Sequence, residues 1–579
     1  MVTLPSLTER HNLIGETKFH FKSFLHIVHR QLLNAFFHAP KFHDGGLLKN
    51  QPVISSSESN LWNPDDNPEN WILTAGKIEN LRIAIKCLNG IEISPNKIFS
   101  FWRHIGNPNL GKGYVVGREV REGCIIPTIA GGLCQLSNAL YDAALKAGFE
   151  IIERHKHTKV IKGSLAEQDR DATVKWNYVD LRFKSSIPFR IEIEISADKL
   201  IVQFRSPGKV TGTENKSKAI LAFSKLNDCY SCGNFACFKH PDRSLSKPER
   251  AITTFILDER WEEYDNYIQT IGTDKDFFIL PFHQNRLFSS KRYYWTIKNE
   301  GNVATSSLPA LQRMVASRVF SKFRANPFSL GLALDKRVAI GLSKHIPVES
   351  THIIVSQNLL AFIWETGVLG GRTFDVLMSR LPMEKLHERL DMAYAKYPES
   401  KTLNDFRASQ HLIDLENTAL TRSRHIITPH QEITDIFNNK SIKLDWSKPK
   451  GNGRKLIGKK ILFPASALGR KGAYEVRQLA KELDLQIVIS GRAEENLDFW
   501  NGVQTEMAGV DPFENIGLVV YPTYIEHQPR LLLKAITYGL PIVTTTACGL
   551  SPSENVTIVP MGDFDTLKRV VAEKIGTRP

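Results

Sequence analysis

The chain has 579 residues, 42% of them hydrophobic and 23% charged, which is the composition of a folded protein and excludes disordered or collagen-like classes. Single hydrophobic cores stop growing at roughly 250–300 residues, so about three or four domains are expected. The formal net charge of +14 favours anionic partners. Because lysine and arginine are scattered and form no tract, we expect a nucleotide sugar or a membrane surface and no nucleic acid.

The amino-terminal region gives no export signal. It lacks the charged start, apolar middle and small-residue cleavage site of a secretory peptide, and no run of about 18 apolar residues predicts a spanning helix. We therefore expect a cytoplasmic protein. Residues 19–38 mix apolar with basic side chains and predict an amphipathic helix, which either packs on the protein or makes peripheral contact with a membrane surface.

Three polar stretches are typical of connectors: residues 51–70, 206–218 and 445–460 are rich in Gly, Pro, Ser, Asn, Asp or Lys. They predict a multidomain α/β protein. Its parts would be an N-terminal helical segment with a linker at 1–71, an α+β domain at 72–206, a Cys-rich connector at 207–249, and two further domains at 250–445 and 446–579.

The part from 72 to 206 combines a helix with β-rich runs. Leu136, Leu140, Ala143 and Ala147 recur at helical spacing after IAGGLCQ, and Gly148 is a stop signal. Farther on, YVDLRFK, FRIEIEIS and KLIVQFR are alternating or apolar β-rich runs. Together they predict an antiparallel sheet with helices.

Cys134 lies at the predicted start of that helix. Gly131 and Gly132 would let the backbone turn sharply and approach a ligand, with Gln135 beside them as a ligand-binding candidate. Unpaired N–H groups and the positive end of the helix dipole favour a thiolate near the helix start, which suits a nucleophile. The alternative is a packing or ligand-binding role, because free cysteine is among the most buried residue types.

A nucleophile also needs a base and orienting groups. His155 and His157 follow on a predicted strand, where residues two apart share a face. Arg170, Asp171 and Asn177 add anion-binding or orienting side chains, with Asp171 as the candidate third catalytic member and Arg170 as a ligand-binding candidate.

Several motifs in this part occur in the order found in one known family. FSFWRHIGNPNLGKGYVVGREV, GGLCQLSNALYDAALKAGFEIIERHKHT and DRDATVKWNYVDLRFK strongly resemble the VanW family, named from vancomycin-resistance gene clusters, over about residues 78–205. The resemblance implies a link to cell-envelope glycan or peptidoglycan biology and no settled reaction. The chain has AGGLCQ where the family usually has a third glycine.

A cysteine cluster lies in the predicted connector. Cys229, Cys232, Cys237 and His240 have the spacing C-x2-C-x4-C-x2-H. Four soft nitrogen and sulfur ligands favour tetrahedral Zn²⁺, in a structural role. An iron–sulfur cluster with Cys124 or another distant cysteine as fourth ligand is the competing hypothesis.

From about residue 458 onward, strands and helices alternate. KKILFPA, LQIVIS, IGLVVYP and LPIVTTT are apolar strand runs, separated by helical runs such as KGAYEVRQLAKELD and QPRLLLKAITYG. Alternation with continuously apolar strands predicts a parallel sheet covered on both faces.

The stretch GLVVYPTYIEHQPRLLLKAITYGLPIVTTTACGL resembles the donor-binding domain of GT-B glycosyltransferases of the group 1 type. The family's E-G-x-P turn and G-x-P-V-V strand have counterparts in Glu526, Pro529, Gly539, Pro541 and Val543. Such a turn lies outside the carboxyl end of a parallel strand, where open sheets bind ligands. The resemblance covers about residues 250–579 and implies two Rossmann-like domains, the first on the acceptor side.

In the same family, basic residues after the first strand hold the donor's diphosphate. Lys471 in FPASALGRKGAYE matches the family lysine, and Arg470 could replace the usual arginine, whose position is Ser466. The second glutamate of the family pair is Lys534 here, which could pair with Glu526 or contact phosphate.

These observations support one main hypothesis and an alternative. The first is a VanW-domain glycosyltransferase that moves a sugar from a nucleotide-sugar donor to a cell-envelope glycan or lipid-linked acceptor. The alternative is an acyl-transferase or hydrolase that depends on Cys134, or a peptidoglycan-binding protein linked to vancomycin resistance, with a degenerate glycosyltransferase half.

Overall fold

The computed structural model describes most of the chain outside its amino-terminal segment. The described residues are 21, 25, 28, 39–62, 71–121, 124–156, 165–176, 179–208, 252–283, 292–297, 300–320, 327–405, 407–449 and 458–576. They divide into two compact units. The first unit comprises the chain up to residue 251 with residues 347–351 and 369–372, and the second unit comprises the rest.

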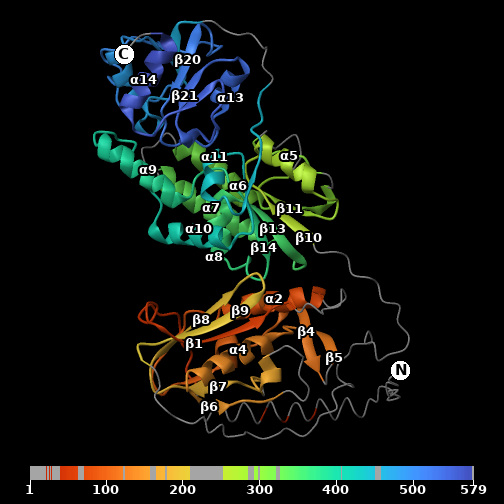
Figure 1. The fold of residues 1–579 in the computed structure, drawn as a ribbon. Coiled ribbons are helices and arrows are strands. Elements are labelled where there is room, and N and C mark those ends of the chain that lie inside the picture. The colour runs from red at the N-terminus through yellow and green to blue at the C-terminus, as the bar shows by residue number, and fades with distance from the viewer. Residues whose placement is uncertain are drawn as a thin grey trace. The chain divides into compact units, whose positions relative to one another are not determined.

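The first unit is an α+β domain, as predicted, built mainly from antiparallel strands (Figure 1). A four-stranded sheet has the order β1-β9-β8-β2, a three-stranded sheet has the order β3-β7-β6, and β4 and β5 form a hairpin. Its elements are β1 (Val53–Asn60), α2 (Trp71–Ile85), β2 (Glu92–Ile93), β3 (Ile98–Ser100), α3 (Phe101–Ile105), β4 (Val116–Arg121), β5 (Cys124–Ile129), α4 (Leu133–Lys146), β6 (Glu150–Glu153), β7 (Arg182–Lys184), β8 (Phe189–Ile195) and β9 (Lys199–Arg205).

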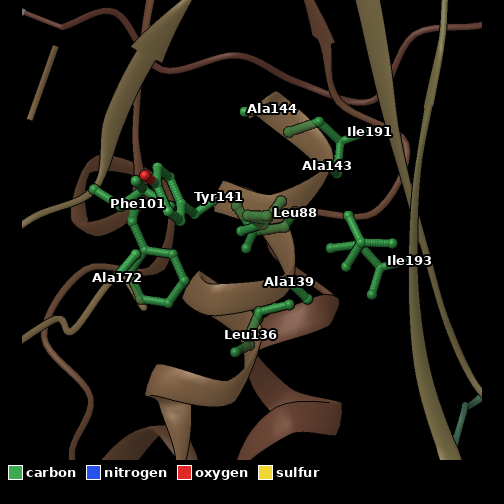
Figure 2. Close-up of a cluster of buried hydrophobic side chains, with 14 of the residues drawn as sticks. Leu88, Phe101, Leu136, Ala139, Tyr141, Ala143, Ala144, Ala172, Ile191 and Ile193 are labelled. Atoms are coloured by element: carbon green, nitrogen blue, oxygen red, sulfur yellow. The ribbon is translucent and has the colours of Figure 1, made fainter. Parts of the chain in front are cut away.

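The core of the first unit lies between α4 and the four-stranded sheet. Figure 2 shows Leu136, Ala139 and Ala143 of α4 on the side that faces Ile191 and Ile193 of β8. All five side chains are buried. Small alanines at helical spacing let the helix approach the strands closely, which explains the predicted stripe on this helix.

Strand β1 corrects the predicted connector at 51–70. The serine-rich run pairs antiparallel with β9, and Ser55 and Ser57 are buried in alternation with more exposed neighbours. Helix α4 packs on β1, and the amide of Gln135 donates to the Ser59 hydroxyl at 3.0 Å and the Asn60 carbonyl at 2.8 Å. Small polar side chains look like a linker in sequence, but here they provide room for a helix.

Only three positions of the predicted amphipathic helix are described. Phe21, Leu25 and Val28 are helical and exposed, by 62%, 50% and 37% respectively. Their spacing places them on one face of a helix. Within the described part of the chain, no helix is long and apolar enough to cross a membrane.

The second unit contains two Rossmann-like lobes, each with a sheet whose described registers are parallel (Figure 1). The predicted fold class is therefore confirmed. The amino-terminal lobe has the strand order β12-β11-β10-β13-β14-β15-β16. Its elements are β10 (Ile252–Ile256), α5 (Glu262–Ile271), β11 (Phe277–Leu280), β12 (Val303–Thr305), α6 (Ser307–Phe320), α7 (Pro327–Ser343), β13 (Ser350–Ser356), α8 (Gln357–Glu365), β14 (Thr373–Leu377), α9 (Met383–Lys396), α10 (Gln410–Arg422), β15 (Ile426–Thr428), α11 (Gln431–Ile436) and β16 (Ser441–Lys443).

The carboxy-terminal lobe has the order β19-β18-β17-β20-β21-β22. Each strand and helix run predicted from the sequence here is an element of the expected type. The elements are β17 (Lys460–Phe463), a 3-10 turn at Gly469–Lys471, α12 (Ala473–Glu482), β18 (Ile487–Ile489), β19 (Thr505–Met507), β20 (Ile516–Tyr521), α13 (Arg530–Thr537), β21 (Ile542–Thr544), β22 (Val556–Ile558) and α14 (Phe564–Ile575).

The turn before α4 is held by a close backbone contact. Gly131 and Gly117 approach so closely that a methyl group on either would overlap the carbonyl of the other. The amide of Asn80, on α2, donates to the carbonyls of Val115 and Gly131, both at 3.0 Å. Glycine is required here because the protein's own backbone occupies the space.

Gly131→Ala is therefore expected to destabilise the first unit. The added methyl would lie 2.6 Å from the Gly117 carbonyl oxygen, and such overpacking typically costs about 1–3 kcal/mol. Calorimetry of the full chain should show a lower unfolding midpoint for this unit, by roughly 2–4 °C per kcal/mol. Gly46→Ala is the matched control, because a methyl there meets nothing within 4 Å. Equal midpoints for the two variants would contradict the prediction.

Candidate functional site

The sheet of the carboxy-terminal lobe brings two predicted residues together. Strands β17 and β20 are central neighbours, with β18 and β19 on one side and β21 and β22 on the other. The strand order reverses between them, and open parallel sheets bind ligands outside the carboxyl ends of strands at such a point. Lys471 lies in the turn after β17, and Glu526 lies in the loop after β20.

Lys471 and Glu526 form an ion pair, with 2.9 Å between Nζ and Oε2. Both side chains are largely buried, with 22% and 16% of their surfaces exposed. The Lys471 ammonium also donates to the Ile525 carbonyl at 3.1 Å, and the Tyr521 hydroxyl donates to Glu526 at 2.5 Å. The pair thus joins the two loops that follow the central strands.

Glu526 is held as a carboxylate. Burial alone would raise its pKa, but the charge of Lys471 and the hydrogen bonds from Tyr521 and the Gln528 N–H outweigh burial, so the pKa lies below its ordinary value. The second carboxylate oxygen accepts the N–H groups of His527 at 2.8 Å and Gln528 at 3.0 Å. These N–H groups lie just before α13, where an anion would also be stabilised.

The turn that carries Lys471 is fixed from both sides. Its Gly469 N–H donates to Glu495 at 2.6 Å, and the Arg470 carbonyl accepts the Tyr524 N–H at 3.0 Å. Gly472 has φ 79°, and a methyl there would lie 2.3 Å from the Pro522 carbonyl oxygen. Arg470 is largely buried, which lowers the pKa of its guanidinium, while Asp405 and Glu495 oppose that shift.

Lys534 does not pair with Glu526, which was one of its two expected roles, and its expected contact with phosphate stays a prediction. Its ammonium is 5.4 Å from the ring centre of Phe513 and 5.8 Å from that of Tyr538. The cationic partner of Glu526 is therefore Lys471 and not Lys534. The cause is local, because Lys534 lies in the last turn of α13 and faces those rings.

A cavity of about 690 Å³ lies between the two lobes of the second unit. The carboxy-terminal lobe contributes Glu526, His527 and Gln528 to its lining. The amino-terminal lobe contributes residues after β10, β11, β13 and β14 and from α6 and α7, which include Glu259, Trp261, Tyr293, Arg313, Asp335, Gln357, Asn358 and Arg380. A pocket of this size suits a small polar molecule.

The amino-terminal lobe has its own charged cluster at the equivalent place, which sequence reasoning missed. Strands β10 and β13 are the central neighbours of its sheet. Asp258, just after β10, accepts both terminal nitrogens of Arg313, one of them at 2.9 Å, and also the amide of Asn358. The only local signal was a carboxylate pair directly after the apolar run TTFIL.

Asp335 completes this cluster. One of its carboxylate oxygens accepts from Arg313 at 2.8 Å. Burial raises the pKa of Asp335 to about 6, with the nearby charge of Asp258 adding to the effect and that of Arg313 opposing it. Arg313 and Asp335 come from helices far along the chain, so no sequence motif joins them to Asp258.

In the first unit, Cys134 occupies the second position of α4. Its sulfur contacts the Thr173 hydroxyl at 3.6 Å and the Val174 carbonyl at 3.7 Å. Gly132, before it, has φ 100°, and a methyl there would meet the Lys77 side chain at 2.1 Å. The glycines thus bring the backbone against Gly117 and Lys77, and the ligand contacts expected for Gly131, Gly132 and Gln135 stay predictions.

The predicted base follows the strand instead of lying on it, because β6 ends at Glu153, opposite Arg182, where its antiparallel partner β7 begins. The His155 ring contacts the Glu153 carboxylate at 3.1 Å. Within the described residues, the hydrogen bonds of the Cys134 thiol go to Thr173 and Val174 and to no histidine.

The remaining predicted residues lie partly inside and partly outside the described ranges. The Arg170 guanidinium lies 3.2 Å from Asp142, and the buried Asp171 offers its carbonyl to Arg154 at 2.7 Å. His157, Asn177, Cys229, Cys232, Cys237 and His240 lie outside the described residues. No group of three or more His, Cys, Asp or Glu that could hold a metal occurs among the residues that are described. Zinc or an iron–sulfur cluster at the cysteines therefore stays a prediction.

Comparison with known proteins assigns the first unit. Residues 76–205 match the family model described as VanW like protein. The vancomycin B-type resistance protein VanW of Enterococcus faecalis is 32% identical over 139 residues, which cover 23% of this chain and 50% of that protein. The uncharacterized protein YoaR of Bacillus subtilis is 32% identical over 106 residues, covering 18% and 34% respectively. The chain thus spans half or less of each of these relatives.

Among solved structures, the apo form of the lipopolysaccharide outer core galactosyltransferase WaaB covers 56% of this chain and 91% of its own, with 13% identity and a TM-score of 0.30. The sequence match is the more specific finding. Residues 76–205 are therefore a VanW-like domain within a longer chain.

Proposed function

We propose that the second unit is a glycosyltransferase that takes its sugar from a nucleotide-sugar donor. The observation that carries the proposal is the Lys471–Glu526 pair at the point where the strand order of the carboxy-terminal lobe reverses. A cation and a hydrogen-bonding carboxylate at this place match what the GT-B resemblance implies. The cavity between the lobes leaves room for an acceptor opposite them.

The chemistry follows from the charges. During transfer, the bond between the anomeric carbon and the diphosphate oxygen breaks, and the oxygen of an acceptor hydroxyl bonds to that carbon. The proton of that hydroxyl is released and can be taken up by the leaving diphosphate. Negative charge accumulates on the leaving diphosphate, so fixed cations at Lys471 and Arg470 would stabilise it. The N–H groups of His527 and Gln528 would add to this stabilisation once Glu526 turns to hydroxyl groups of the donor.

The VanW-like domain supports a particular acceptor class. One of its relatives bears the name of a vancomycin-resistance protein, so we propose that the acceptor is a cell-envelope glycan or a lipid-linked precursor. Peripheral membrane contact through the helix that contains Phe21, Leu25 and Val28 would suit such an acceptor, because these exposed apolar side chains lie on one helix face.

Donor binding is tested by thermal shift. Millimolar UDP-glucose, UDP-N-acetylglucosamine or GDP-mannose should raise the melting temperature of the chain. A ligand at 100 times its dissociation constant adds about 2.7 kcal/mol to the free energy of unfolding. Lys471→Met should weaken that binding at least tenfold. Lys568→Met is the matched control, because Lys568 pairs with Glu482 at the surface of the same lobe.

Lys471→Met also leaves the Glu526 charge unpaired, so the double variant Lys471→Met/Glu526→Gln keeps the test valid if the single variant is unstable. An unchanged dissociation constant in both variants would contradict the assignment of Lys471 to the diphosphate. The absence of any shift with all three nucleotide sugars would contradict the proposed function.

The pH dependence gives a second test. The Glu526 pKa is lowered, so its ion pair is fully present above the ordinary value of about 4.3 and is lost only as the pH falls through the lowered pKa. Burial lowers the pKa of His430, beside the Ala547 carbonyl, to about 4, so this side chain stays neutral. Calorimetric titration of UDP-glucose should therefore give one affinity from about pH 6.5 to about pH 8. A tenfold change over that range would contradict a charged Glu526 beside a neutral His430.

A further inference from the structure

The cavity between the lobes has arginines that are already neutralised. Arg313 is held by Asp258 and Asp335, with nitrogen–oxygen distances of 2.9 and 2.8 Å. Arg380 donates to Glu416 at 2.8 Å, and Glu416 is fully buried. Nearer the surface, Arg292 pairs with Glu259.

We call the part of the cavity lining formed by Glu259, Arg292, Arg313, Asp335 and Arg380 the wall. The carboxylates in this wall and those behind it, Asp258 and Glu416, therefore balance its cations. A phosphate entering from the acceptor side would meet Asp335 and Glu259 while each arginine described in the lining already has a carboxylate partner. Because like charges repel, the carboxylates of Asp335 and Glu259 oppose a second anion at this wall.

Asp335 offers the wall a hydrogen-bond acceptor. Within the described part of the chain, one of its oxygens accepts from Arg313, and the side chain remains 23% exposed where it lines the cavity. A hydroxyl group can donate to such an oxygen. Asp335 is fixed in this position because Arg313 is itself held by Asp258 through two bonds.

We propose that this wall selects a neutral, hydroxyl-rich acceptor over a phosphorylated one, with Asp335 as the residue that positions the acceptor hydroxyl. The proposal rests on the proposed glycosyltransferase function, which it deepens by narrowing the acceptor to a glycan whose uncharged, hydroxyl-bearing part meets this wall. It contrasts with the net charge of +14, which favours anionic partners for the chain as a whole. Specificity of this kind comes from unfavourable contacts with the wrong ligand as much as from favourable ones with the right ligand.

The test measures binding of methyl α-glucoside, methyl α-N-acetylglucosaminide and their 6-phosphates to the full chain, by saturation-transfer NMR, with and without UDP. The neutral glycosides should bind at least tenfold more tightly than their phosphates. Asp335→Asn should weaken the neutral glycosides at least fivefold and narrow the preference over the phosphates, with UDP affinity unchanged. Asp391→Asn is the matched control. Asp391 lies on α9, which contributes no lining residue, and like Asp335 it pairs with an arginine, Arg407, at 2.7 Å.

If Asp335→Asn does not fold, the wild-type chain supplies the same comparison. Arg313, Asp258 and Glu259 are the charged groups around Asp335, whose pKa of about 6 makes it protonated at about pH 5 and ionised at about pH 7.5. Neutral glycosides should then bind more weakly at the lower pH.

Tighter binding of the phosphates by the wild-type chain would overturn the proposal. So would an Asp335→Asn variant that behaves like Asp391→Asn, or a folded chain that binds none of the glycosides. Loss of UDP binding alone would count against the donor site and the proposed function, while the preference among glycosides measured without UDP still decides this inference.

Discussion

The candidate donor site depends on a buried charge that needs a partner. The side chains of Lys471 and Glu526 are only 22% and 16% exposed, so their mutual attraction is screened less by water than that of a surface pair. The pair also fixes the loops after β17 and β20, because Lys471 donates to a carbonyl of the second loop and Glu526 accepts two of its N–H groups. An anionic ligand that engages Lys471 would replace one carboxylate partner by another.

The amino-terminal lobe also has an ion pair at this place, but there the residue after the first central strand is a carboxylate and its partner is a cation. There Asp258 is the buried charge at the end of the central strand, and Arg313 is the partner that makes it stable. Each lobe thus places a charged group at the point where its strand order reverses, and the cavity lies between these two points. The two sheets share this reversal of strand order, but the charged groups that follow their first central strands have opposite signs.

Some of this could be predicted from the sequence. Apolar strands that alternate with helices identified the parallel sheet of the carboxy-terminal lobe, and the glycines around Cys134 marked a sharp turn before α4. Lys471 and Glu526 could be named because the segments that contain them resemble the donor-binding domain of GT-B glycosyltransferases. Composition alone predicts a connector at strand β1, since its serines are polar, although Ser55 and Ser57 are buried. Asp335 could not be found, because its partners lie on separate elements and only the fold brings them together.

Contacts between the lobes link the donor loop to the rest of the second unit. Arg530, the first residue of α13, donates to the buried Glu263 of α5 through two bonds at 2.6 and 2.8 Å. Its guanidinium lies 6.0 and 5.9 Å from the ring centres of Trp261 and Trp446. Since α13 begins four residues after Glu526, the bonds that hold the lobes together also fix the start of the helix beside the ion pair. The geometry of the site is therefore a property of both lobes, and neither sheet alone would supply it.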